Sequence, residues 1–193
     1  MKFGLYSFLR EMVKYPTRTG SIAPSSEELS DLITDKANLY DKETVVEFGT
    51  GTGVFTEKIL DKINPDTTFI ALEINPTFVE VTKKRCPDVV IYNDSAENVK
   101  IHLEKHGKSS CDCIISGLPW TAFHPQLQDR LLGSILNVLK PGGKLLTFSY
   151  SHSVVFPTAM RFRRKLNSMF SKVNTSRTIW SNFPPAFIYS AKK

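Results

Sequence analysis

The chain has 193 residues, of which 41% are hydrophobic, and this size and composition favour one well-buried domain over residues 1–193. Its net charge of +6 is unevenly spread: residues 130–193 hold 11 Lys and Arg and no Asp or Glu, leaving 14 Lys and Arg against 19 Asp and Glu in residues 1–129. No apolar run approaches the ~20 residues of a membrane-spanning helix, and no signal-peptide pattern opens the chain, so we expect a cytoplasmic protein without a transmembrane segment.

The basic C-terminal third indicates an anionic partner, either nucleic acid or an anionic membrane surface, although a plain solvated basic face has the same composition. The three cysteines, Cys86, Cys111 and Cys113, have neither the spacing of a zinc site nor that of a disulfide framework. We therefore expect structural cysteines and no metal.

The N-terminal segment, residues 1–37, reads as a helical cap. Residues 2–15 carry apolar side chains at helical spacing, which suits either a helix packed on the core or one lying in a membrane interface. Residues 17–24 read as a loop. Ser25 then has the position of a helix N-cap, with Glu28 three residues later completing a capping box, and this helix should run to about Ala37.

The next stretch is the most informative in the chain. Residues 44–48 are β-branched and apolar, as in a strand buried on both faces, and a glycine-rich turn follows at 49–53. Residues 54–63 have helical spacing, and a second apolar strand at 68–72 ends in Glu73. This order predicts the nucleotide-binding half of a doubly wound α/β fold, with Glu73 placed to accept hydrogen bonds from ribose hydroxyls.

The loop itself narrows the choice of nucleotide. A dinucleotide G-x-G-x-x-G would need glycine at position 54, which is Val, and no Gly-Lys pair provides a phosphate-binding loop here. The acid-x-G-x-G-x-G pattern that begins at Glu47 instead resembles motif I of the class I S-adenosylmethionine-dependent methyltransferases. An unrelated glycine turn between a strand and a helix is the plainer alternative.

The remaining chain continues to alternate between helical and strand patterns. Helices are expected at about 76–85, 96–105, 126–139 and 158–173, and strands at 89–92, 111–115, 144–150, 176–182 and 186–190. Seven strands that end in a hairpin match the class I methyltransferase sheet: a Rossmann-like, mostly parallel α/β sheet with a C-terminal antiparallel hairpin and helices on both faces.

Two further segments resemble methyltransferase motifs. Asp94 follows the third strand, where family members bind the adenine amino group, although it could also cap the next helix. The fourth strand ends in Ser116-Gly117-Leu118-Pro119-Trp120, where rRNA adenine dimethyltransferases carry Asn-Leu-Pro-Tyr. Gly117 has no side chain to grip a base, whereas Trp120 offers a π-face to a cationic amine. A core Trp is the alternative for Trp120.

Taken together, the sequence resembles the small bacterial phospholipid N-methyltransferases, relatives of the rRNA adenine dimethyltransferases. The resemblance rests on IAPSS at 22–26, SGLPW at 116–120 and the W-x-N-x-P-P-A-F segment that begins at Trp180. It implies methylation of phosphatidylethanolamine towards phosphatidylcholine, with S-adenosylmethionine converted to S-adenosylhomocysteine. The implied cofactor-binding residues are Glu47, Gly49, Thr50, Gly51, Thr52, Gly53, Glu73, Ile74, Asp94, Ser95, Ala96 and Ser116, with Ser25 as a possible neighbour.

Catalysis on an amine requires a proton acceptor. His124, His152, Tyr6 and Tyr15 are the candidates, while Trp120 is expected to contact the amine. Arg18, Arg161 or Arg164 could bind a lipid phosphate.

The expected partners are an anionic membrane surface and a phospholipid substrate, with the protein peripheral on the inner face of the membrane. The basic, Met- and Phe-rich helix at 158–173 has the composition of an interfacial helix. We expect no nucleic-acid partner and no obligate protein partner. The alternatives are an RNA adenine methyltransferase, a soluble small-molecule amine methyltransferase, and a non-catalytic cofactor-binding protein.

Overall fold

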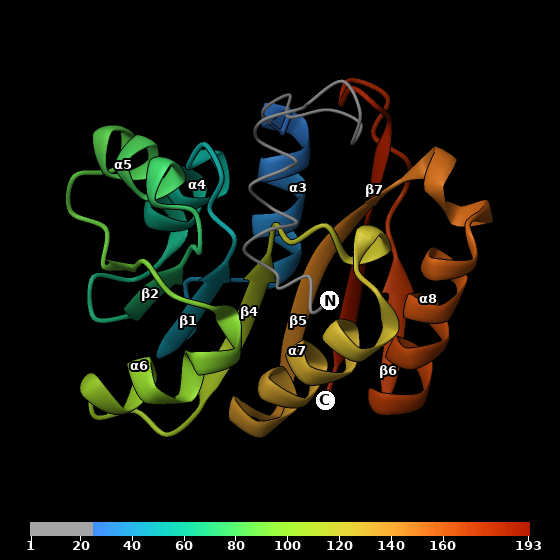
Figure 1. The fold of residues 1–193 in the computed structure, drawn as a ribbon. Helices are drawn as coiled ribbons and strands as arrows, with labels where there is room; N and C mark the ends of the chain where they lie inside the picture. Colours follow the sequence, from blue (N-terminus) through green and yellow to red (C-terminus); the bar gives the residue numbers. More distant parts are fainter. Residues whose placement is uncertain (1–24) are drawn as a thin grey trace.

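The computed structural model describes residues 25–193, and its centre is a seven-stranded sheet (Figure 1). The strand order is β3-β2-β1-β4-β5-β7-β6. Strands β1 to β5 are parallel, and β7 runs antiparallel to both β5 and β6. This is the class I methyltransferase architecture that the sequence predicted. The strands are β1 (Thr44–Phe48), β2 (Thr68–Leu72), β3 (Ile91–Tyr92), β4 (Cys111–Ser116), β5 (Leu139–Tyr150), β6 (Lys172–Thr175) and β7 (Ala186–Lys192).

Helices cover both faces of the sheet. In chain order they are α3 (Glu27–Ala37), α4 (Val54–Lys62), α5 (Pro76–Arg85), α6 (Val99–Lys105), α7 (Pro125–Val138) and α8 (Pro157–Met169), with 3-10 turns η1 (Ala96–Asn98), η2 (Trp120–Ala122) and η3 (Ser151–Val155). Helices α3 and α4 contribute to one apolar core, and α6, α7 and α8 contribute to the other. Figure 1 shows these two groups on opposite sides of the strands.

The central strands are apolar at consecutive positions because both of their faces are covered. In β1, for example, Val45 belongs to the core under α3 and α4, while the next residue, Val46, belongs to the core under α6 and α7. All five β1 residues are buried. The carboxyl ends of β1, β2, β4 and β5 therefore meet at one rigid sheet edge, where a ligand site is expected in folds of this kind.

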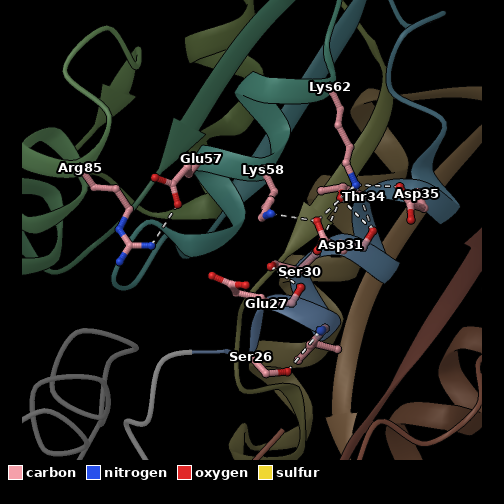
Figure 2. Close-up of polar contacts among 11 residues, drawn as sticks. Ser26, Glu27, Ser30, Asp31, Thr34, Asp35, Glu57, Lys58, Lys62 and Arg85 are labelled. Atoms are coloured by element: carbon pink, nitrogen blue, oxygen red, sulfur yellow. Dashed lines mark hydrogen bonds and ion pairs between the residues drawn. The ribbon is translucent and has the colours of Figure 1, made fainter. Parts of the chain in front are cut away.

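Helix α3 is fastened to α4 by charged side chains on facing turns (Figure 2). Lys58 Nζ lies 3.1 Å from Asp31, and Lys62 Nζ lies 2.6 Å from Asp35. Because these pairs are partly exposed, each contributes at most about 1 kcal/mol. Their main effect is to fix the position of α3 beside α4, the helix that follows the glycine loop.

The start of α3 corrects one sequence prediction. Its N-cap is Ser26, not Ser25: the Ser26 hydroxyl accepts a hydrogen bond from Leu29 N at 3.2 Å. Glu28 does not complete a capping box, because its carboxylate accepts hydrogen bonds from Arg177 and Ser181 in the C-terminal segment.

The structure of the C-terminal tail corrects two further sequence predictions. The helix expected at 158–173 ends at Met169, and the next strand is Lys172–Thr175, paired with β7, not 176–182. Residues 176–185 form a loop, joined to β7 by an isolated bridge between Ile179 and Ala186. The strand expected at 89–92 is likewise limited to Ile91–Tyr92.

The helix predicted at 2–15 and the loop at 17–24 lie outside the described residues, as do Tyr6, Tyr15 and Arg18. Within residues 25–193, every helix is too short or too polar to cross a bilayer.

Candidate active site

The glycine loop, residues 49–53, joins β1 to α4, and its three glycines differ in what surrounds them. All three have left-handed backbones, with φ of 73° at Gly49, 55° at Gly51 and 80° at Gly53. A Cβ at Gly49 would lie 2.9 Å from Leu118, and one at Gly53 would lie 3.3 Å from Thr82. A Cβ at Gly51 would meet nothing within 4 Å. Gly51 is therefore the point at which the bare backbone borders open space and can be approached by a ligand.

Glu73, at the end of β2, holds this loop. Its Oε2 accepts a hydrogen bond from Gly51 N at 3.1 Å, and its Oε1 accepts one from Asn75 N at 2.8 Å. The side chain is buried, and burial raises the pKa of Glu73 although these backbone donors oppose the shift. The structure thus brings together the two features on which the sequence prediction depended, the glycine turn and the acid twenty residues later.

Glu47 lies on β1, two residues before the loop, and is fully buried. Its Oε2 accepts a hydrogen bond from the Thr56 hydroxyl at 2.7 Å, while Oε1 has no hydrogen-bond partner among the described residues. Burial raises the pKa of Glu47 from 4.5 to about 8, against the effect of the Thr56 bond and with a contribution from the Glu73 charge. A buried carboxyl with an unused oxygen, two residues before an approachable glycine backbone, fits the polar amino-acid part of a cofactor such as S-adenosylmethionine.

Two threonines tie the loop to α5. The Thr50 and Thr82 hydroxyls are 2.8 Å apart, and the Thr82 hydroxyl also lies 3.3 Å from Gly51 O. Sequence reasoning placed Thr50 at the cofactor and missed Thr82, because a threonine inside an ordinary helix carries no signal of its own. Thr52 and Ile74 are half-buried, and Ile74 packs against the core.

Asp94 lies after β3 and does not cap the following helix, because the N-cap of η1 is Ser95. Its contact with the adenine amino group stays a prediction. Its Oδ1 accepts hydrogen bonds from Ser95 N at 2.7 Å and Asn98 Nδ2 at 2.9 Å, and its Oδ2 lies 2.8 Å from His102 Nε2. Partial burial would raise the pKa of Asp94, but the bonds from His102, Asn98 and Ser95 together lower it. The carboxylate is thus ionised, fixed in position and 38% exposed, so it can still accept a hydrogen bond from a ligand.

The residues next to Asp94 build the turn that holds it. Ser95 caps η1 through a hydrogen bond from Glu97 N to its hydroxyl, and Ala96 is buried. His102, which orients the Asp94 carboxylate from α6, was not predicted, since a single histidine eight residues away has no recognisable spacing.

The tip of β4 lies directly against the glycine loop. Gly117 N donates to Phe48 O at 2.8 Å, and a Cβ at position 117 would lie 2.4 Å from Gly49 O. This distance is far below any van der Waals contact. The absence of a side chain at Gly117 therefore has a steric cause: with this backbone, an asparagine could not occupy the position.

Trp120 is a core residue, contrary to the expectation that it contacts the substrate. It is 1% exposed, its ring stacks on Phe162 at 4.9 Å between centroids, and its Nε1 donates to the Ser116 hydroxyl at 3.1 Å. The indole has no open face for an amine. Ser116 is also buried, and its hydroxyl accepts a second hydrogen bond from Leu118 N, so this residue organises the β4 tip.

The two candidate histidines follow the carboxyl ends of neighbouring strands. His124 precedes α7, is exposed, and lies 3.0 Å from Gln126 Oε1 through Nδ1. His152, in η3 after β5, is exposed and stacks on Tyr150 at 5.7 Å between centroids. Both imidazoles therefore belong to the sheet edge that carries the glycine loop. Ser25 is half-buried before α3, and Tyr15 lies outside the described residues.

Comparison with known proteins agrees with this geometry. Residues 45–143 match a family described as "Methyltransferase domain". An ornithine lipid N-methyltransferase from Singulisphaera acidiphila is 31% identical over 188 residues, which cover 95% of this chain and 93% of that protein. A probable ribosomal RNA small subunit methyltransferase A from Methanococcoides burtonii is 31% identical over 104 residues, covering 51% of this chain and 34% of that protein.

Among solved structures, the O-methyltransferase TomG from Streptomyces achromogenes, in complex with SAM, aligns with a TM-score of 0.69 at 15% identity and covers 100% of this chain and 92% of its own. Its fold is the one described above. The chain belongs to the methyltransferase domain family, and it is a class I enzyme that uses S-adenosylmethionine.

Proposed function

We propose that this enzyme methylates the amine nitrogen of a membrane-lipid headgroup. The observation that carries the proposal is the 31% identity to an ornithine lipid N-methyltransferase over nearly the full length of both chains. The lipid-enzyme resemblance of the SGLPW and W-x-N-x-P-P-A-F segments supports the same substrate class. Phosphatidylethanolamine and an ornithine lipid both present an amine beside an anionic group, and we expect phosphatidylethanolamine as the substrate.

A lipid amine arrives as an ammonium and must lose its proton before it can accept a methyl group. When bound, S-adenosylmethionine supplies a methyl group that its sulfonium already activates. Glu73 and the backbone at Gly51 would hold the ribose and amino-acid parts of the cofactor, and Asp94 would hold the adenine. His124 and His152, at the same sheet edge, are the described candidates for accepting the proton.

The basic helix α8 would attract the enzyme to anionic lipid, but not in the way its composition suggested. Phe162 and Leu166 are buried against the sheet, so beyond its first turn α8 has no exposed apolar face to lay into a membrane. Its exposed side carries Arg161, Arg163 and Arg164. Each such charge near an anionic surface contributes about 1 kcal/mol, which supports reversible, salt-sensitive adhesion.

RNA adenine methylation is the second candidate function. The partial similarity to a ribosomal RNA methyltransferase and the basic C-terminal third favour it. The packing at Gly117 argues against RNA methylation. The asparagine of an Asn-Leu-Pro-Tyr segment would stand at position 117, where its Cβ would lie 2.4 Å from Gly49 O.

The test is transfer of labelled methyl from S-adenosylmethionine in parallel reactions. One contains anionic vesicles with phosphatidylethanolamine, one contains vesicles with an ornithine lipid, and one contains ribosomal RNA. Label in either lipid supports the proposal and identifies the headgroup. Label in RNA alone would replace it with the second candidate.

A further inference from the structure

The loop at 176–185, between β6 and β7, is firmly attached to the body of the protein. Ser26 N at the start of α3 donates to Asn182 Oδ1 at 2.9 Å, and Asn182 Nδ2 donates to Pro184 O at 2.7 Å. Arg177 donates to Glu28 at 2.7 Å, and Ser181 donates to the same carboxylate. The conformation of this loop is therefore set by contacts with a helix about 150 residues away in sequence.

This attached loop presents a large apolar ring to solvent. Trp180 is 79% exposed, although the residue before it, Ile179, is fully buried. Leaving an indole in water forgoes the stabilisation that its burial would give, and three hydrogen bonds to α3 hold the loop in the conformation that exposes the ring. An exposed tryptophan on a fixed support indicates a partner.

A second exposed apolar segment adjoins this loop. Ser151 N donates to Pro185 O at 2.8 Å, which places η3 next to the end of the 176–185 loop. Beyond this contact, Val155 is 71% exposed and Phe156 is 49% exposed. Together with Trp180 and with Met160 in the first turn of α8, these side chains form what we call the apolar rim.

The surroundings of the apolar rim favour an anionic partner. Residues 151–185 contain six Lys and Arg and no Asp or Glu. Of these, Arg177 is paired with Glu28 and Lys165 with Asp129, whereas the α8 arginines lie on an exposed surface. The apolar rim follows the carboxyl end of β5, which is the sheet edge that carries the glycine loop. In Figure 1 the β7 end of this loop and the start of α8 both lie along that edge.

We propose that the apolar rim enters the interfacial region of an anionic lipid bilayer, with Trp180 as its main anchor. Tryptophan, apolar neighbours and flanking arginines are the combination that binds at the boundary between headgroups and acyl chains. The inference deepens the proposed function and rests on it for its purpose, since insertion here would bring the mouth of the active site to the headgroups. It also supplies the apolar contact that α8 beyond its first turn, with its inner face buried, does not.

The chain contains two tryptophans, and their environments make the test selective. Trp120 is 1% exposed in the core, whereas Trp180 is 79% exposed. The full-length protein would be mixed with vesicles of phosphatidylethanolamine and phosphatidylglycerol, with and without bromine on the acyl chains, and tryptophan emission would be recorded. We expect a blue shift on vesicle addition and quenching by the brominated lipid. Both changes should disappear in Trp180→Phe, which leaves Trp120 as the reporter.

Vesicle sedimentation measures how much Trp180 contributes to partitioning of the protein onto the membrane. Trp180→Ala should weaken partitioning about tenfold, the loss expected for one large apolar side chain at an interface. The matched control is Tyr40→Ala. Tyr40 is also exposed, at 66%, but it precedes β1 and so lies at the opposite end of the parallel strands. Its removal should leave partitioning unchanged, and Trp180→Ala should bind S-adenosylmethionine as tightly as the wild type does.

The outcomes separate this inference from the proposed function. Quenching of Trp180 supports the inference whether or not lipid is methylated, and quenching without methylation would count against the proposed function alone. Methylation of vesicle lipid with no quenching, or equal partitioning of Trp180→Ala and Tyr40→Ala, would overturn the inference. A change in Trp180 emission with ribosomal RNA but not with vesicles would overturn it as well.

Discussion

The two halves of the sheet differ in where their informative side chains lie. On the β1–β2–β3 side, the important polar groups are inside. Glu47 is fully buried two residues before the glycine loop, and Glu73, nearly as buried, accepts a hydrogen bond from Gly51 N. On the β5–β7–β6 side, the informative groups are outside, with exposed arginines on α8 and an exposed Trp180. A small charged molecule is selected by preorganised buried donors and acceptors, whereas a lipid surface is bound by side chains that remain in water until contact.

If the β1–β2–β3 side binds the cofactor and the β5–β7–β6 side binds lipid, a substitution on one side should leave binding on the other side intact. Glu73→Ala has the largest expected effect. It removes the acceptor proposed for the ribose and frees Gly51 N, so we expect S-adenosylmethionine to bind about 100-fold more weakly, or about 3 kcal/mol. Isothermal titration calorimetry measures this, with exposed Glu80→Ala on α5 as the control. Vesicle partitioning should not change, and a cofactor affinity within threefold of wild type would show that the cofactor lies elsewhere.

The reciprocal experiment replaces Arg161, Arg163 and Arg164 with Gln. At about 1 kcal/mol per charge, partitioning onto anionic vesicles should fall on the order of 100-fold at low salt, and the difference should vanish at high salt. Cofactor affinity should be unaltered. A matched variant that neutralises Lys83, Lys84 and Lys108, on the β3 side, should retain vesicle binding, and equal losses in both variants would mean that only net charge matters.

Gly117→Ala tests the contact at which the two halves meet. The added methyl group would lie 2.4 Å from Gly49 O, and relieving this clash should cost about 1–3 kcal/mol of unfolding free energy and loosen the cofactor loop. Urea unfolding gives the first quantity and calorimetry the second. Gly133→Ala is the control, because its Cβ meets nothing within 4 Å and helix α7 should gain about 0.5–1 kcal/mol. Unchanged stability of Gly117→Ala would indicate that the tip of β4 moves freely.

The last expected effect is a pH dependence on the cofactor side. Because the pKa of Glu47 in the folded protein is about 8, above its ordinary 4.5, the folded state holds this proton more tightly than the unfolded state. The contribution of Glu47 to stability is therefore full below pH 4.5 and is lost by about 1.4 kcal/mol per pH unit up to pH 8. Glu47→Gln should remove this slope in urea unfolding between pH 5 and 8. An identical slope in the variant would mean that Glu47 is ionised when folded.

The cofactor side could be predicted from sequence because its signals are local. The strand at 44–48, the glycine turn and Glu73 are spaced by backbone geometry, and the structure places them as expected. The cap of α3 was missed by one residue, since Ser25 and Ser26 are both good N-cap residues and the choice depends on the contact between Ser26 N and the distant Asn182.

The tail and the β4 tip were harder because their outcome depends on tertiary contacts. Phe162 in a basic helix suggested a membrane-facing ring, but it stacks on Trp120, and each ring buries the other. The residues at 176–182 have strand-like composition, yet hydrogen bonds to α3 hold them as a loop while 172–175 pair with β7. Neither partner can be inferred from spacing along the chain.

The close approach of Gly117 to Gly49 has a consequence for how such an enzyme can change its substrate. A side chain at position 117 can be accommodated only if the glycine loop also shifts. Substitutions at position 117 and in the loop around Gly49 therefore depend on each other. We therefore expect a route from this scaffold to an asparagine at position 117 to pass through an intermediate with weakened cofactor binding, unless both positions change together. Laboratory evolution by single substitutions should therefore leave position 117 untouched and find new substrates through the loops at 151–156 and 176–185.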